Sequence, residues 1–390
     1  GAWDTVTEEF GLISDVSLED EIAAHVASAE LSVEEFLLYY LPLDDVEMLV
    51  TRGDDHWIAS LRNEMLEGEV RILDEDDAPL GVNLNWLSFE SEGGALDPLY
   101  DVNPVEVADV NFSTEQLLLD GEDFGHWSFK YRATEHGGRF EDLAVVALGV
   151  QVAAGSLGEW HYKNGQHGSL FTGDIVIDDL AEAQQKFGFA SSIEGEGLKL
   201  TADVSWDGSP AMVDIERVSG EVEILEGSGR FVQAETGGAL KLLGIFDFAS
   251  LARRFRLDFS DLIDDGFEFT DIQGVISFDE GEVVVQEPIV IHGSSGKFTV
   301  GGGMNLVSNT LDNDMIVTLP VGRTLPWYAA YSAIATGPLA GAGVMLAQKV
   351  FENQINQMSS AKYKISGSIE EPEIEFVTIF NDTVREAIPE

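Results

Sequence analysis

Most of this chain alternates hydrophobic and polar residues with a period of two. In residues 198–206, hydrophobic side chains occupy every second position, from Leu198 to Trp206. The same alternation recurs at residues 221–225, 274–278, 297–300 and 362–366. Alternation of this kind is typical of β-strands that bury one face. We therefore predict a mainly β protein in which each strand has one apolar side.

Short runs rich in Gly, Asp, Ser and Pro separate these strands. We predict turns at residues 207–210, 226–229 and 279–282, each between runs that can pair antiparallel. Residues 57–86 and 120–160 repeat the order of strand, turn and strand. A long antiparallel meander of hairpins is the simplest topology for this pattern.

Two short segments favour helices instead. In residues 17–40, one helix is predicted to begin near Ser17 and a second to run from Val33 to Leu41, ending at Pro42. Residues 178–188 offer an acidic N-cap, good helix formers and a terminal glycine. These helices either cover part of the apolar sheet face or serve as plain connectors.

The longest weakly charged stretch covers residues 324–348, but glycines and two prolines interrupt it, so we do not interpret it as transmembrane. Its hydrophobic spacing predicts a helical segment at about residues 325–358. This segment either caps the end of the sheet or forms a hydrophobic tip that contacts a membrane or a partner. The candidate contact residues are Trp327, Tyr328, Leu339, Val344 and Phe351.

A sheet with one apolar face must hide that face, and the predicted helices are too few to cover about twenty strands. The sheet can close into a barrel, fold into a sandwich, or curl into an open groove that a ligand fills. The facing of each strand stays ambiguous, because a shift of one residue exchanges the two sides. The candidate lining positions are Leu200, Val204, Trp206, Val222, Ile224, Ile276, Phe278, Ile289, Ile291, Phe298, Val300 and Met304.

Composition narrows the functional classes. The 390 residues are 44% hydrophobic, which is enough for a large folded core. The net charge of −50 repels nucleic-acid phosphates, so nucleic-acid binding is not expected. The acidic residues are spread along the chain and indicate a solvated surface, such as that of a protein from a high-salt environment. No cysteine is present, so disulfides and thiol chemistry are excluded.

Residue types that carry catalysis are scattered. The seven histidines show no HExxH spacing, and Gly195-Glu196-Gly197 lacks the third glycine of a dinucleotide-binding loop. His161 and His167 flank a turn, where we expect them to be exposed. We predict a non-enzymatic protein with no catalytic residues, no metal site and no cofactor.

Arg253, Arg254 and Arg256 stand out against the acidic background. Guanidinium groups bind phosphate in bidentate fashion, so these residues are candidates for contact with lipid headgroups at the rim of a groove. Pairing with nearby aspartates in surface ion pairs is the other interpretation.

Several blocks in the C-terminal half occur in one order, at residues 238–262, 266–274, 300–306, 310–312 and 363–368, followed by Glu371-Pro372. This order resembles the C-terminal region of the AsmA-like proteins of Gram-negative envelopes, particularly their YhdP branch. The resemblance implies a long β-groove that carries phospholipid acyl chains between the inner and outer membranes. It further implies a periplasmic location and an N-terminal inner-membrane helix, which we expect in a longer protein of which this chain is a fragment.

We expect three regions: an N-terminal β-groove segment with short helices at residues 1–95, central repeats at 96–238, and an AsmA-like C-terminal region at 239–390. The expected partners are phospholipids and the two membranes or their proteins. Two alternatives stay open: a structural or adhesive β-solenoid or sandwich closed on itself, and an acidic surface module that binds carbohydrate or calcium.

Overall fold

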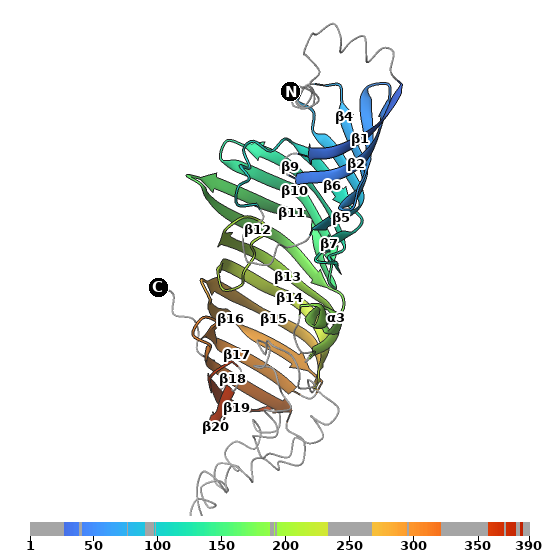
Figure 1. The fold of residues 1–390 in the computed structure, drawn as a ribbon. Helices are drawn as coiled ribbons and strands as arrows, with labels where there is room; N and C mark the ends of the chain where they lie inside the picture. Colours follow the sequence, from blue (N-terminus) through green and yellow to red (C-terminus); the bar gives the residue numbers. More distant parts are fainter. Residues whose placement is uncertain are drawn as a thin grey trace, which may run out of the picture. The chain divides into compact units, whose positions relative to one another are not determined.

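The computed structural model describes residues 27–38, 41–75, 77–89, 97, 99–187, 191, 193–232, 267–294, 296–320, 358–369, 372–379 and 383–384. Within these residues the chain forms twenty strands and the short helix α3 (Figure 1). The prediction of a mainly β protein is confirmed.

The strands are long and follow one another with few interruptions. The first twelve are β1 (Ser28–Leu38), β2 (Leu41–Arg52), β3 (His56–Arg62), β4 (Leu66–Leu73), β5 (Leu80–Phe89), β6 (Val110–Thr114), β7 (Leu117–Leu119), β8 (Glu122–Asp123), β9 (His126–Thr134), β10 (Gly137–Ala147), β11 (Val150–Lys163) and β12 (Gln166–Ile177). After α3 (Leu180–Lys186) come β13 (Ile193–Asp207), β14 (Val218–Phe231), β15 (Phe267–Asp279), β16 (Glu282–Gly293), β17 (Gly296–Asn305), β18 (Thr310–Pro320), β19 (Met358–Gly367) and β20 (Pro372–Ile379).

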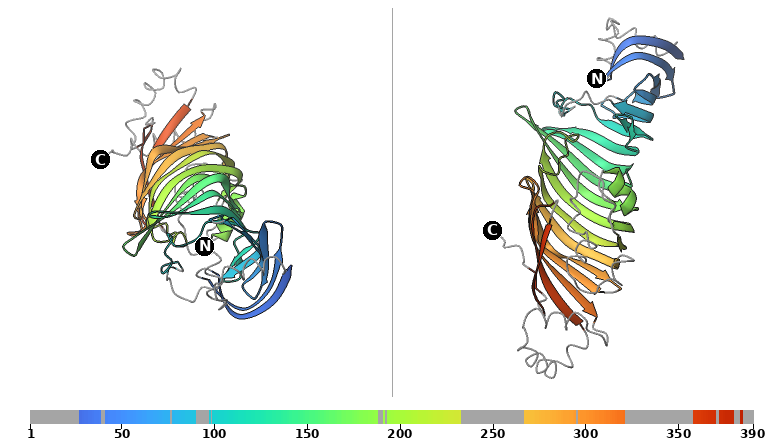
Figure 2. Two further views of the ribbon diagram at one scale, coloured as in Figure 1. Left: turned by 90° about the horizontal axis from the view of Figure 1, so that it is seen from above. Right: turned by 60° about the horizontal axis from the view of Figure 1, so that its bottom comes forward.

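The strands belong to one sheet, and nearly all neighbours are antiparallel. Strands β1 to β5 pair in chain order, and so do β14 to β20, whose bowed ribbons lie side by side in Figure 2. The departure from the predicted meander is at β5, which pairs in parallel with β6 and β7. Among the described strands β1 pairs only with β2 and β20 only with β19, so the sheet is open rather than closed into a barrel.

The chain divides into two compact units, each with its own core. The first comprises residues 1–173 and 205–213, and the second comprises residues 174–204 and 214–390. The main core of the first unit consists of Leu43, Val46, Met48, Leu61, Leu66, Val70, Leu80, Val82, Leu84 and Leu87. That of the second consists of Phe231, Phe267, Phe269, Val285, Ile289, Ile291, Phe298, Val300, Leu311, Met315, Val317, Tyr363, Ile365 and Ile369.

Tight turns join the hairpins. Between β15 and β16, Glu280 and Gly281 have φ angles of 45° and 86°. Positive φ at both central positions is the geometry of a two-residue turn that matches the twist of the flanking strands. The turn predicted at residues 279–282 is therefore confirmed.

The helix expected from Val33 to Leu41 is wrong. Residues 33–38 belong to β1, where Val33 pairs with Val46 and Phe36 with Leu43 of β2. Leu and Glu are good helix formers, but intrinsic propensities differ by less than about 1 kcal/mol per residue, and pairing along the whole of β2 outweighs them. The helix predicted to begin near Ser17 falls outside the described residues, and so does nearly all of the segment predicted at about residues 325–358.

The helix expected at residues 178–188 is confirmed as α3. Asp179 is its N-cap, because one of its carboxylate oxygens accepts a hydrogen bond of 2.9 Å from the backbone N–H of Glu182. Buried Gln184 donates from its side-chain amide to the carbonyl oxygen of Ile193, at 2.7 Å. This bond attaches the helix to the first residue of β13.

The turn expected at residues 226–229 is also wrong, because β14 runs through it without a break. A Cβ at Gly227 would lie 2.8 Å from Leu198 Cδ1, and one at Gly229 would lie 2.3 Å from the carbonyl oxygen of Glu194. These glycines allow neighbouring strands to approach closely, which is the other common reason for glycine inside a strand.

His167 lies inside the first unit, so the expectation that it is exposed is wrong. Trp160 donates from Nε1 to His167 Nδ1 at 3.0 Å, and His167 Nε2 is 2.8 Å from the carbonyl oxygen of Tyr100. Because Nδ1 accepts, the ring proton must be on Nε2, which donates to Tyr100. His161, by contrast, is exposed and lies 3.2 Å from Glu159.

We expect His167→Leu to lower the free energy of unfolding by about 1–3 kcal/mol, because the Trp160 indole N–H and the Tyr100 carbonyl would lose their partner. His161→Leu is the control and should change stability by less than about 0.5 kcal/mol. Urea denaturation of both variants checks this. Equal losses in the two variants would show that the His167 bonds contribute nothing specific.

Candidate functional site

One face of β14–β20 carries rows of apolar side chains that cross the strands. The register aligns Ile289 with Val300, Val300 with Met315, Met315 with Tyr363, and Tyr363 with Phe376. Three further rows on this face are Ile272-Ile291-Phe298-Val317-Ala361-Ile379, Val222-Ile276-Val285-Gly302-Asn313-Ile365-Ile374 and Gly220-Phe278-Val283-Met304-Leu311-Gly367-Pro372. We call these side chains the apolar face of the second unit.

The opposite face of the same strands is mainly polar. One row there reads Glu221-Ser277-Val284-Gly303-Asp312-Ser366-Glu373, and another reads Gly301-Asp314-Lys364-Glu375. The sheet therefore separates an apolar side from a charged side over seven strands, as the period of two in the sequence predicts.

The register settles which predicted lining positions share a face. On β14 to β17, nine of them belong to the apolar face: Val222, Ile224, Ile276, Phe278, Ile289, Ile291, Phe298, Val300 and Met304. On β13, Leu200, Val204 and Trp206 share one side by alternation. A Cβ at Gly220, which pairs with Phe278, would lie 2.8 Å from Val204 Cα, so this part of β13 adjoins the apolar face.

The twelve positions differ in exposure. Ile289, Ile291, Phe298 and Val300 are buried, and the exposed fraction of Ile291 is 0%. The other eight are half-buried: Leu200, Val204, Trp206, Val222, Ile224, Ile276, Phe278 and Met304. The half-buried positions are accessible to a ligand without rearrangement, whereas the buried ones form the core.

An aromatic group in the core went unrecognised in the sequence. The rings of Phe267 and Phe298 meet edge to face with centroids 4.6 Å apart, and those of Phe231 and Phe269 lie 5.0 Å apart. The sequence also gave no special weight to Tyr363, which lies on the apolar face next to Met315. The alternation of residues 362–366 was a signal that could have found it.

The apolar face carries no charge at Tyr363 at neutral pH. Burial raises the pKa of the Tyr363 hydroxyl from 10.0 to about 12, because the ionised form would lose its hydration. The nearest charged rows are on the opposite side of the sheet, where Lys362 lies 3.0 Å from Asp314.

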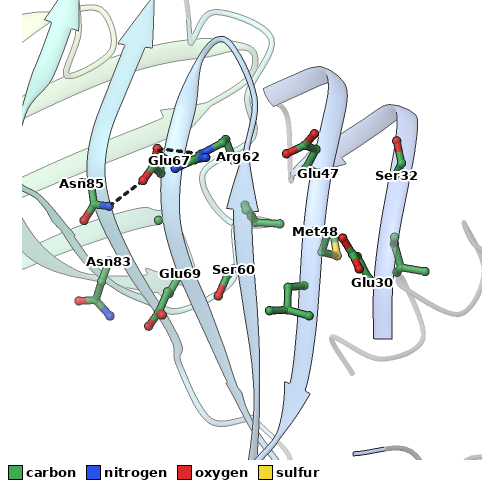
Figure 3. Close-up of a pocket in the computed structure, with 14 residues that line it drawn as sticks. Glu30, Ser32, Glu47, Met48, Ser60, Arg62, Glu67, Glu69, Asn83 and Asn85 are labelled. Carbon is green, nitrogen blue, oxygen red and sulfur yellow. Dashed lines mark hydrogen bonds and ion pairs between the residues drawn. The ribbon is translucent and has the colours of Figure 1, made fainter. Parts of the chain in front are cut away.

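The first unit contains a cleft of about 800 Å³ on strands β1 to β5 (Figure 3). Its lining is mainly polar, and Arg62 donates to Glu67 at 3.0 Å while Asn85 donates to the same carboxylate at 3.4 Å. The Arg62 hydrogen bond lowers the pKa of Glu67, which is therefore charged at neutral pH. A cleft lined by charged side chains is not suited to hold hydrocarbon chains.

Arg253, Arg254 and Arg256 lie outside the described residues, as do Trp327, Tyr328, Leu339, Val344 and Phe351. In the part of the chain that the structure describes, no group of three His, Asp or Glu side chains could hold a metal ion. The described residues contain no helix with the length and hydropathy needed to cross a membrane.

Comparison with known proteins identifies a relative and a family of this chain. The chain is 27% identical over 217 residues to the intermembrane phospholipid transporter YhdP of Escherichia coli (strain K12). The match covers 56% of this chain and 17% of that relative. That relative is named as a transporter and not as an enzyme, which agrees with the prediction of a non-enzymatic protein. No solved structure matches the chain. The model of the YhdP protein family matches residues 2–374, so this chain belongs to the YhdP family.

Proposed function

We propose that this chain is a phospholipid-binding segment of a longer intermembrane transporter, with acyl chains lying along the apolar face. The observation that carries the proposal is the set of apolar rows across β14–β20 in an open sheet with a polar opposite side. The transport activity named for the Escherichia coli relative supports the same reading.

Physical chemistry favours such a face for transport. Hydrophobic contact is non-directional and roughly proportional to the apolar area removed from water, so a chain can shift along the rows without breaking specific bonds. In this proposal the half-buried positions on β13, β14 and β15 contact acyl chains, together with Met304 on β17. The four buried positions lie on the same face, on β16 and β17, where they hold the sheet together. The headgroups stay in water.

The proposal extends to location and partners. A segment of an intermembrane transporter works in the periplasm, between an inner-membrane tether in the longer protein and the outer membrane or its proteins. Arg253, Arg254 and Arg256 are proposed to contact headgroup phosphates. The proposed membrane or partner contacts are Trp327, Tyr328, Leu339, Val344 and Phe351.

Photocrosslinking tests whether lipid lies on this face. A photoreactive residue at Val222 or Ile276 of the 390-residue chain should crosslink to phospholipid supplied in phosphatidylethanolamine vesicles, because both side chains are half-buried on the apolar side. Mass spectrometry of the crosslinked chain measures the yield, and native mass spectrometry of the untreated chain measures co-purifying lipid.

Matched controls are the adjacent residues on the same two strands, Glu221 and Ser277, which pair with each other on the polar side. We expect at least a tenfold lower crosslink yield there. Equal yields on both sides, or a lipid-free chain with no crosslinks at any position, would reject the proposal and favour a structural or adhesive β-protein.

A further inference from the structure

Asn313 of β18 is a polar exception on the apolar face of the second unit. The register places it between Gly302 of β17 and Ile365 of β19, and on its own strand Leu311 and Met315 point to the same side. Its exposed fraction is 2%, and in the part of the chain that is described its side-chain Nδ2 has no hydrogen-bond partner. An amide donor is therefore buried among hydrocarbon and left unpaired.

Such a donor is unfavourable in a surface that serves packing alone. Burying an N–H group without an acceptor destabilises the folded protein, and nearly all buried polar atoms in folded proteins are paired. A leucine or valine at this position would avoid the cost. The position of Asn313 is thus better explained by an acceptor that arrives with a ligand.

Glycine on the neighbouring strand lets β17 approach Asn313 closely. Gly302 has a φ of 110°, and a Cβ there would lie 2.4 Å from the carbonyl oxygen of Asp312 and 3.2 Å from Asn313 Oδ1. No side chain can therefore stand beside the amide on β17. Met304 is the diagonal neighbour across the strands, and it is half-buried and conformationally flexible. We infer that a lipid reaches Asn313 by displacing the Met304 side chain.

We propose that Asn313 Nδ2 donates a hydrogen bond to an acyl carbonyl oxygen of a lipid whose chains lie on the apolar face. This inference rests on the proposed function and adds a specific polar contact to it. Carbonyl oxygens are the acceptors covalently next to the hydrocarbon chain, so they are the ones that reach a donor set among apolar side chains. Both the esters of a diacyl phospholipid and the carboxylate of a free fatty acid supply this chemistry.

Competition between ester and ether lipids tests the contact. The 390-residue chain is incubated with vesicles of equal amounts of dipalmitoyl phosphatidylethanolamine and its dihexadecyl ether analogue, which has the same headgroup but no carbonyl. Mass spectrometry of the re-isolated chain gives the ratio of bound lipids. We expect an ester preference of about threefold to tenfold, corresponding to one net hydrogen bond. If added palmitate displaces both lipids from the wild-type chain but not from Asn313→Leu, the donor serves a fatty-acid carboxylate.

Asn313→Leu and Asn313→Ala should both bring the ratio close to one while lipid binding persists. Thr299→Val removes a polar side chain from the opposite side of the sheet, where Thr299 pairs with Ile316, and should keep the wild-type ratio. The melting temperature of Asn313→Leu should stay within a few degrees of wild type, since Nδ2 makes no hydrogen bond within the described residues that the substitution would remove.

Equal binding of ester and ether lipids by the wild-type chain would overturn this inference and would leave the proposed function standing. That result is expected if the Asn313 amide bonds only to water. A large fall in melting temperature in both Asn313 variants would also overturn it, because it would indicate a structural partner. Failure of the wild-type chain to bind either lipid would instead reject the proposed function itself.

Discussion

Replacing Ile291 with alanine should lower the free energy of unfolding by about 2–5 kcal/mol. Ile291 is fully buried and lies between Ile272 of β15 and Phe298 of β17 in the same row. Truncation removes buried methyl groups and leaves a cavity, because the paired strands on both sides cannot collapse into the space. Urea denaturation monitored by circular dichroism measures the loss.

The control is Val290→Ala on the same strand. Val290 is half-buried on the other side of the sheet, where it pairs with Gln273 and Thr299. Its truncation should cost less than about 1 kcal/mol. If the two variants lost equal stability, the apolar rows would not be the core of the second unit, and the assignment of faces would have to be revised.

Lys362→Met should destabilise the protein by about 3 kcal/mol. Lys362 Nζ lies 3.0 Å from Asp314 Oδ2, and the two side chains are only 16% and 7% exposed. The same ammonium donates to the carbonyl oxygen of Thr383 at 3.1 Å. Removing it leaves the buried carboxylate of Asp314 without this cation, and little water reaches the site to compensate.

Two comparisons isolate the effect of this ion pair. Lys364→Met, on the same side of β19, removes the ion pair between Lys364 and Asp312, whose two side chains are 42% and 54% exposed. Its loss should lower the free energy of unfolding by less than about 1 kcal/mol. Adding Asp314→Leu to Lys362→Met should restore most of the stability, since no unpaired charge then remains. A double variant as unstable as the single one would mean that packing by Lys362, and not its charge, is what matters.

The sequence alone determined the strand content, the approximate number of strands and the division of each strand into an apolar and a polar side. Alternation with a period of two is a local property of the chain, so it can be read without the fold. It also located α3 and the turn at residues 279–282, whose signals lie within a few residues of the chain. It did not find the strand at residues 33–38, where a helix-favouring composition yields to pairing with β2.

Only the tertiary structure decided which strand faces belong together and which positions are accessible. Facing depends on register, and register is set by partners on other strands, as between Val222 and Ile276 or Asn313 and Ile365. Burial depends on the same partners, so alternation could not separate the core position Ile291 from half-buried positions on the same face. The unpaired amide of Asn313 was invisible to the sequence for the same reason, since being unpaired is a property of the surroundings and not of the residue.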